Sequence, residues 1–255
     1  MNALRDNTTA NANTAVGLNS LLVNTTGTQN VAMGTYSLDA NTTANDNTGV
    51  GYAALSDNTT GANNTAFGSE ALLFNSTASN NTAVGSDALR LNTTGAQNTA
   101  VGALAADEIT TGAENTAIGY RSMASTTTSS YNTAVGSDSL RTNSTGANNT
   151  ALGYSALVLN TTASNNTAVG YNAMLSNTTG AENCAVGVQA LDANTTGANL
   201  VAMGFNAGTV STTGNNHTLI GHGAGSSLTT ASDCTFIGMA AGDTATDGSS
   251  STCIG

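Results

Sequence analysis

The side chains best able to do chemistry in this chain lie near its C-terminal end. His217 and His222 are separated by four residues, and Asp233 and Cys234 follow them. Imidazole, carboxylate and thiolate groups are common ligands of transition metals. Their spacing, however, matches none of the ligand patterns of zinc sites. We therefore interpret both histidines as polar turn residues, and we expect no catalytic residues, no metal site and no cofactor.

Asparagine followed two residues later by threonine or serine is the most repeated chemical motif. It is the acceptor signal for N-glycosylation when no proline intervenes. Ten copies share one spacing and begin at Asn7, Asn24, Asn41, Asn58, Asn75, Asn92, Asn143, Asn160, Asn177 and Asn194. Further copies begin at Asn63, Asn80, Asn148, Asn165 and Asn216.

Two interpretations of these asparagines stay open. Dense glycosylation would make the protein a sugar-coated extracellular fibril subunit. Alternatively, asparagines stacked at equal spacing form a ladder in which side-chain amides bond one another and cap turns. A second series, from Asn13 to Asn183, recurs at the same spacing without the glycosylation motif, and this favours the ladder.

All of these motifs belong to an exact repeat of 17 residues, which occurs fifteen times without insertion. We number the positions 1 to 17 within each repeat and call the residues at one position a column. The consensus is x-x-A-L-x-x-N-T-T-G-x-x-N-T-A-V-G, and residues 86–102 follow it closely. The glycines of column 17, which we expect to form turns, are Gly17, Gly34, Gly51, Gly68, Gly85, Gly102, Gly119, Gly136, Gly153, Gly170, Gly187, Gly204, Gly221, Gly238 and Gly255.

The columns predict an all-β fold, a parallel β-solenoid with fifteen coils of 17 residues. Column 16 is apolar in every repeat, and column 4 is Leu or Met in eleven. Positions 14 and 16 lie on one face of a short strand, so we expect both to point inward and to share a core with column 4. Stacked units can bury these side chains, whereas one unit cannot. At about 4.8 Å per coil, the array would extend about 70 Å.

The threonine columns 8, 9 and 14 suggest one further binding chemistry. A regular array of outward threonines at strand spacing could order water and bind ice. Calcium-binding repeats need an aspartate at a fixed position, whereas acidic residues such as Asp6, Asp39 and Glu114 are scattered here. Ice binding stays an alternative, and calcium binding is not expected.

The repeats fall into two groups. Residues 1–204 hold twelve regular repeats, and residues 205–255 hold three variants that we expect to continue the same solenoid. In the variants, column 4 becomes Gly208, Gly225 and Gly242, while column 15 becomes bulkier. No polar terminal cap is visible, so we expect the chain to be a segment of a longer protein.

The three cysteines occupy three different columns and form no series. Cys184 replaces a threonine that we expect to point inward, so we interpret it as a small buried residue. Cys234 and Cys253 lie in adjacent repeats, and a disulfide between them is an alternative to two free thiols.

Composition excludes several classes of function. Only 7% of the 255 residues are charged, and the net charge is −11 with four basic residues in all. A nucleic-acid partner requires clustered Lys and Arg, so we expect none. No apolar run approaches the roughly 18 residues of a membrane helix, so we expect no membrane insertion.

The unit N-T-A-V-G-x-x-A-L resembles the head repeats of trimeric autotransporter adhesins, in which N-S-V-A-I-G-x-x-S-like units build a parallel β-roll. It also resembles the N-T-A-V-G and N-T-T-G arrays of phage and bacterial tail-fibre-like proteins. The resemblance covers the whole chain and is best at Asn64–Gly68, Asn81–Gly85, Asn98–Gly102 and Asn166–Gly170. It implies a left-handed coil and an extracellular trimer, on a cell surface or in a phage fibre. The adhesin unit is usually shorter than 17 residues, and no neck, stalk or anchor is visible here.

These observations favour a non-enzymatic, extracellular structural or adhesive module. We expect it to associate with copies of itself as a trimer or fibre and to display repeated Asn and Thr side chains. Many weak contacts from such a surface would sum by multivalency on a cell-surface, matrix or glycan ligand. The glycosylated fibril subunit and the ice-binding protein remain the alternatives.

Overall fold

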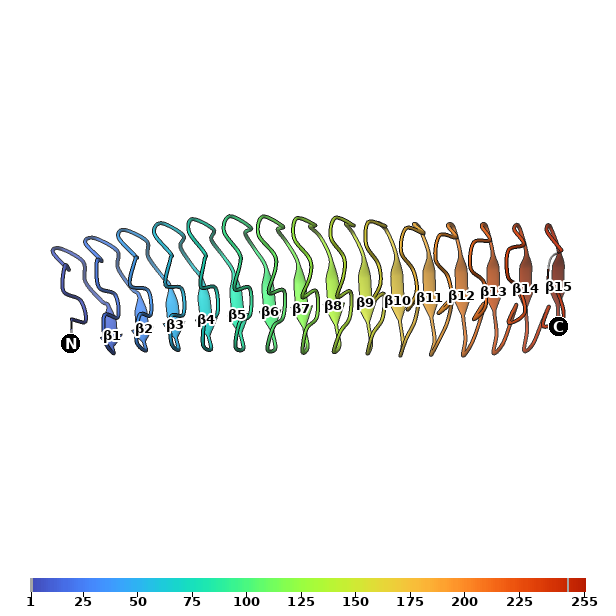
Figure 1. Cartoon of the computed structure of the whole chain (residues 1–255), viewed down its shortest axis with the longest axis horizontal. Helices are drawn as coiled ribbons and strands as arrows, with labels where there is room; N and C mark the ends of the chain where they lie inside the picture. Colours follow the sequence, from blue (N-terminus) through green and yellow to red (C-terminus); the bar gives the residue numbers. More distant parts are fainter. Residues whose placement is uncertain (1, 247) are drawn as a thin grey trace. The chain divides into compact units, whose positions relative to one another are not determined.

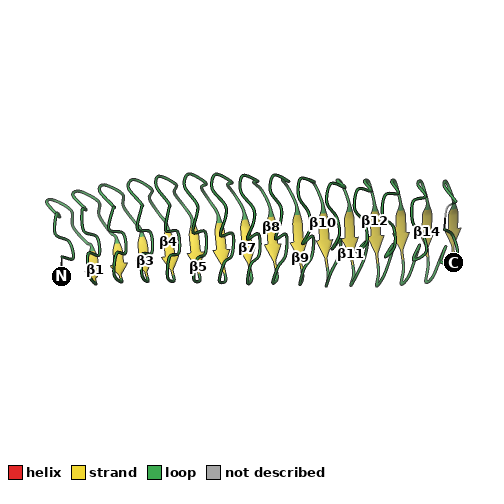
Figure 2. Cartoon of the chain, in the orientation of Figure 1, coloured by secondary structure: helices red, strands yellow, loops and turns green. Residues whose placement is uncertain are grey.

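A computed structural model describes residues 2–246 and 248–255, and these fall into two units, residues 1–130 and 131–255. All regular elements among the described residues are short β-strands, and none of these residues is helical (Figure 2). The predicted all-β parallel solenoid is therefore confirmed. The N-terminal unit holds β1 (Thr14–Val16), β2 (Val31–Met33), β3 (Thr48–Val50), β4 (Thr65–Phe67), β5 (Thr82–Val84), β6 (Thr99–Val101) and β7 (Thr116–Ile118). The C-terminal unit holds β8 (Thr133–Val135), β9 (Thr150–Leu152), β10 (Thr167–Val169), β11 (Cys184–Val186), β12 (Val201–Met203), β13 (Thr218–Ile220), β14 (Thr235–Ile237) and β15 (Thr252–Ile254).

Within each unit the strands pair in parallel and in chain order, as the ribbons of Figure 1 show. Each residue pairs with the residue 17 positions later, for example Thr14 with Val31 in one unit and Thr167 with Cys184 in the other. One repeat is therefore one coil, and coil numbers below are repeat numbers. The zero shift between coils explains why the sequence tolerates no insertion, because one extra residue would exchange the two faces of a strand.

The strands present the opposite face to the one that we predicted. Column 15 is buried and columns 14 and 16 point outward, so that Ala32 is 0% exposed while the neighbouring Met33 is 44% exposed. Column 4 lies in the core as expected, with Leu21, Leu38 and their equivalents fully buried. Since a leucine from column 4 already fills each coil, only a small side chain fits opposite it on the strand. Alanine meets that need, and the larger Val or Met is left outside.

The glycines of column 17 allow adjacent coils to approach closely. Each has a φ between +129° and +145°, which L side chains rarely adopt. A Cβ at Gly51 or Gly170 would overlap the carbonyl oxygen of the next column-17 glycine. Leucines of column 4 also adopt positive φ, as at Leu21 (+50°), so their burial offsets a local cost of about 1 kcal/mol or more.

The variant coils 13–15 keep the register but exchange the contents of the core. β13 pairs with β12 residue by residue, as in the regular coils. Gly208 and Gly225 leave space that Leu219 fills, since a Cβ at either glycine would lie within 3 Å of a Leu219 methyl group. The ring of Phe236 fills the same space beside Gly242. The expected change of repeat at residue 205 thus lies inside the C-terminal unit as an exchange of volume between columns 4 and 15.

Candidate functional site

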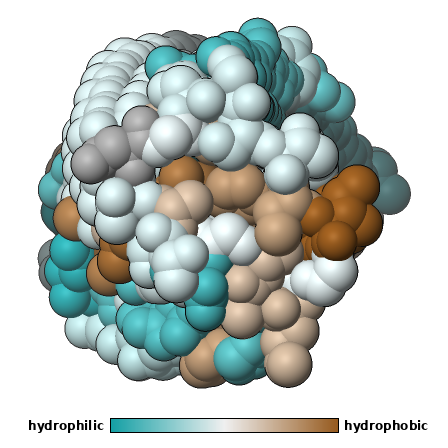
Figure 3. Space-filling view, turned by 90° about the vertical axis from the view of Figure 1, so that its right-hand side faces the viewer, coloured by the Kyte–Doolittle hydropathy of each residue, from teal (hydrophilic) through white to brown (hydrophobic). Residues whose placement is uncertain are grey.

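The most distinctive surface is the outward strand face, which we define as columns 14, 16 and 1. Column 16 is apolar in all fifteen repeats, yet its side chains are exposed, as at Phe67 (58%) in β4 and Met203 in β12. In the C-terminal coil, which faces the viewer in Figure 3, apolar residues fill the interior and also reach the rim. Packing inside the coil does not require this exposed stripe, so it is a candidate site for association.

Column 1 adds aromatic side chains beside the stripe. Tyr154 and Tyr171 stack at 5.5 Å between ring centroids, and Phe205 stacks on His222 at 5.2 Å. Tyr171 remains 50% exposed despite this contact. His222 is therefore an exposed member of the outward strand face, whereas His217 is buried, so the two histidines that suggested a metal site occupy different surroundings.

The outward strand face carries no charge. The fifteen acidic residues occupy columns 2, 5, 6 and 12, except for one in column 9, and the four arginines occupy columns 2 and 5. Columns 14 to 17 and column 1 hold none of them. A continuous uncharged strip on a chain of net charge −11 is a surface on which two like-charged molecules can meet with little repulsion.

The ten asparagines of column 7 form the predicted ladder inside each unit. Nδ2 of Asn41 donates to Oδ1 of Asn24 (2.9 Å) and to the carbonyl of Ala44 (3.2 Å). All of them except Asn7, which is half-buried, are fully buried. The N-terminal ladder stops where column 7 becomes Ile109, and Oδ1 of Asn92 has no partner there.

Column 13 forms a second ladder with a different geometry. Oδ1 of Asn64 accepts a hydrogen bond from the backbone N–H of Asn81 (2.9 Å), and Nδ2 of Asn64 donates to the carbonyl of Ala78 (2.8 Å). Each asparagine therefore satisfies backbone groups of the following coil that would otherwise be buried without a partner. A hydrogen bond of this kind contributes about 1 kcal/mol, and an unsatisfied buried group costs more.

The two sets of glycosylation motifs have different surroundings. A glycan on a buried column-7 asparagine would require Nδ2 to leave both of its hydrogen bonds and the coil interior to open. The second set, in column 12, is exposed at a turn, and Asn63 and Asn165 adopt a positive φ near +60°. Asn tolerates this left-handed conformation well, so backbone geometry alone accounts for asparagine in column 12.

The threonine columns also divide by environment. Thr25 and Thr93 of column 8 donate through Oγ1 to the carbonyl of the next column-8 residue at 3.1 and 3.0 Å. Column 9, by contrast, is exposed at each described threonine. Column 14 lies on the outward strand face and not in the core, which corrects the predicted inward orientation.

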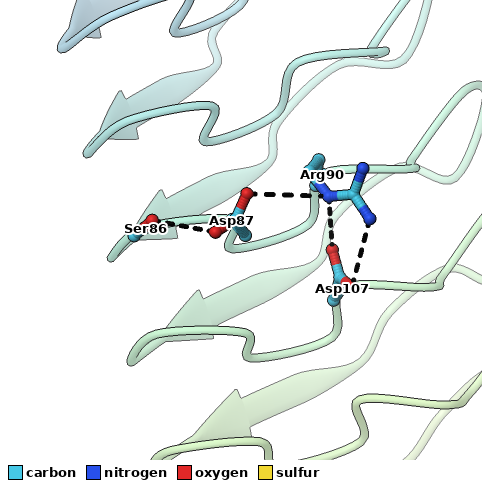
Figure 4. Close-up of polar contacts among 4 residues, drawn as sticks. All are labelled: Ser86, Asp87, Arg90 and Asp107. Atoms are coloured by element: carbon cyan, nitrogen blue, oxygen red, sulfur yellow. Dashed lines mark hydrogen bonds and ion pairs between the residues drawn. The ribbon is translucent and has the colours of Figure 1, made fainter.

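The charged residues make ion pairs between and within coils. Arg90 donates through Nε to Asp107 (3.0 Å) in the next coil and lies 3.6 Å from Asp87, which accepts a hydrogen bond from Ser86 (Figure 4). The hydrogen bond to Asp107 raises the pKa of Arg90. In Asp39, burial raises the pKa, and a hydrogen bond from Ser56 partly offsets this. Within the described residues there is no pocket and no group of three or more His, Cys, Asp or Glu that could hold a metal.

The three cysteines are free thiols. Cys184 is half-buried on the outward strand face, so its predicted inward burial is wrong for the same reason as the rest of column 14. Cys234 is buried and donates through Sγ to the carbonyl of Gly248 (3.2 Å), while Cys253 is exposed. The alternative of a Cys234–Cys253 disulfide is therefore not realised.

No protein-family model, curated protein or solved structure matches the chain significantly. The part of the chain that the structure describes contains no helix long and apolar enough to cross a membrane.

Proposed function

We propose that the chain is a non-enzymatic structural module that associates with copies of itself through the outward strand face. The observation that carries this proposal is column 16, which is apolar in every repeat and exposed on strands whose own core is filled by columns 4 and 15. Contiguous exposed apolar surface on this scale is typical of a protein–protein interface.

Electrostatics favours a second copy of the chain as the partner. Two molecules of net charge −11 repel wherever their acidic columns meet. On the outward strand face they would bury Val, Ile, Met and aromatic side chains beside neutral threonines. Every coil repeats the same small contact, so weak individual contacts add up along the array.

The resemblance to adhesin head repeats and tail-fibre-like arrays supports a trimer and an extracellular location. With columns 7 and 13 buried in the coil, the polar surface that remains for a cell-surface, matrix or glycan ligand consists mainly of column 9 threonines and the turn residues of columns 11 and 12. The proposed adhesive surface is therefore narrower than the Asn and Thr display expected from the sequence.

Native mass spectrometry with light scattering tests self-association. The unmodified chain should appear as a multiple of 25.0 kDa, with three copies expected. The variant Val84→Asp, Val101→Asp, Ile118→Asp places three charges on the outward strand face and should dissociate to the monomer. Because these side chains are partly exposed, the variant should keep its β-sheet circular dichroism.

The matched control places the same charges on column 9 of the same coils, as Thr77→Asp, Thr94→Asp, Thr111→Asp. This control should stay associated. A monomeric unmodified chain, or equal dissociation of both variants, would contradict the proposed interface.

A second candidate function, ice binding, is favoured by column 9. Its threonines are exposed in successive coils at one fixed spacing, whereas the column-8 hydroxyls are engaged with the next coil. An ice binder should act as a monomer and separate the freezing and melting temperatures. The column-9 aspartate variant should abolish that separation, while the outward-face variant should retain it.

A further inference from the structure

One rung of the column-13 ladder is built from a residue that can titrate. His217 lies in coil 13 at the position of Asn183 and its predecessors. Its Nδ1 accepts a hydrogen bond from the backbone N–H of Cys234 (3.2 Å), just as Oδ1 of Asn166 accepts one from the N–H of Asn183 (3.0 Å). The imidazole therefore replaces an amide in the ladder while remaining only 1% exposed.

The surroundings of His217 are adapted to a neutral ring. Nε2 lies against Gly214, where a Cβ would come within 2.5 Å, and near the carbonyl of Ala231, with which it makes no well-oriented hydrogen bond. The titratable groups beside it are Asp233 and the thiol of Cys234. The Asp233 carboxylate is exposed and accepts a hydrogen bond from Asn216 (2.9 Å) instead of one from the ring.

We propose that His217 makes the junction between coils 13 and 14 acid-sensitive. Protonation by solvent would place a hydrogen on Nδ1, which then faces the N–H of Cys234. A bond that needs a lone pair on Nδ1 is lost, and a charge is created in the interior of the coil. The junction then opens locally, whereas the asparagine rungs of coils 9–11 keep the same bond at any pH in this range.

The direction of the pH effect follows from the same geometry. Burial lowers the pKa of His217 below its usual 6.5, against smaller opposing effects of the Ala231 carbonyl and Asp233. The unfolded chain therefore binds this proton more readily than the folded chain does. Stability of the junction is complete above about pH 6.5 and is lost as the pH falls from there toward the folded pKa.

Hydrogen–deuterium exchange on the intact chain tests this inference. After correction for intrinsic exchange rates, protection of peptides covering residues 218–220 and 234–237 should fall by up to about thirtyfold between pH 7.5 and pH 5.0. Peptides from coils 9–11 should show no comparable change. His217→Asn restores the ladder amide and should remove the pH dependence, while His222→Asn, on the outward strand face, should leave it intact.

The inference is overturned if His217→Asn is as acid-sensitive as the unmodified chain, if His222→Asn removes the effect, or if the unmodified chain shows no loss of protection. Nitrogen-15 NMR of the unmodified chain gives a second measurement that needs no variant. His217 should be a neutral Nε2–H tautomer at pH 7.5 and should titrate below pH 6.5, together with the exposure of the Cys234 amide. Titration at or above pH 6.5 would contradict the proposal.

Discussion

Coils 9–12 and coils 13–15 of the C-terminal unit share one backbone register but have different interiors. Coils 9–12 combine Leu or Met in column 4 with Ala in column 15, and their asparagine ladders run from Asn143 to Asn194 and from Asn149 to Asn183. Coils 13–15 combine Gly in column 4 with a larger residue in column 15, and no asparagine remains in either ladder column. The strands nevertheless pair residue by residue across the change, as β12 does with β13.

The comparison separates what the coil requires from what it can exchange. The 17-residue spacing, the column-17 glycine and the small residue of column 3 persist through both regions. Core volume moves from column 4 to column 15, and the amide ladder gives way to Ser211, Leu228 and His217, with no change in pairing. Register therefore depends on backbone approach, and the interior only has to be filled and satisfied.

The largest effect should come from the glycine that both regions share. Gly170→Ala and Gly221→Ala each place a Cβ against the carbonyl oxygen of the next glycine, at a φ of +138° or +136°. Both should lose about 4 kcal/mol or more of unfolding free energy, measured by denaturant titration. Thr162→Ala, an exposed column-9 control, should be nearly neutral. A tolerated alanine in coils 13–15 alone would show that the two regions do not share this constraint.

The next effect should come from transferring the variant core into a regular coil. Ala168→Leu puts a leucine in column 15 of coil 10 and should cost about 1–3 kcal/mol by overpacking. Met174→Gly removes the column-4 side chain of coil 11 and should cost about 2–5 kcal/mol. The double variant should be more stable than the sum of the two by at least about 1 kcal/mol, as a double-mutant cycle would measure. Simple additivity would mean that columns 4 and 15 do not share one space.

The sequence was sufficient for the fold because the spacing is exact, but it was misread for the strand face. Larger apolar residues in column 16 suggested the core, whereas the interior beside Leu157 admits only Ala168 from the strand. The signal that identifies the inner column is a compensation within the chain itself. Column 15 grows to Leu219 and Phe236 in the repeats where column 4 becomes glycine.

The candidate site was predictable only in part. The recurrence of Asn13 to Asn183 without a glycosylation motif pointed to a ladder, and the structure places that ladder inside the coil. The outward strand face could not be recognised once column 16 had been assigned to the core. His217 could not be placed either, because its role depends on the N–H of Cys234 in the next coil and not on any neighbour in sequence.

The smallest effect should come from breaking one rung of the column-7 ladder. Asn160 donates to Asn143 (2.8 Å) and Ala163 (3.0 Å) and accepts from Asn177 (2.9 Å). Asn160→Leu should cost about 2 kcal/mol, because it leaves buried amide and carbonyl groups without partners. Thr162→Leu, on the exposed column 9 of the same coil, should change stability by less than about 0.5 kcal/mol in the same denaturant titration.

Coil 14 carries Leu228 in column 7 naturally, between Ser211 and Ala245, so that leucine leaves no amide of a neighbouring rung unpaired. The cost of Asn160→Leu therefore measures how far a ladder binds its rungs to one another. If that cost is near zero, an isolated leucine is as acceptable inside a ladder as outside one. The two interiors would then differ in shape alone, and the amides would contribute no cooperativity between coils.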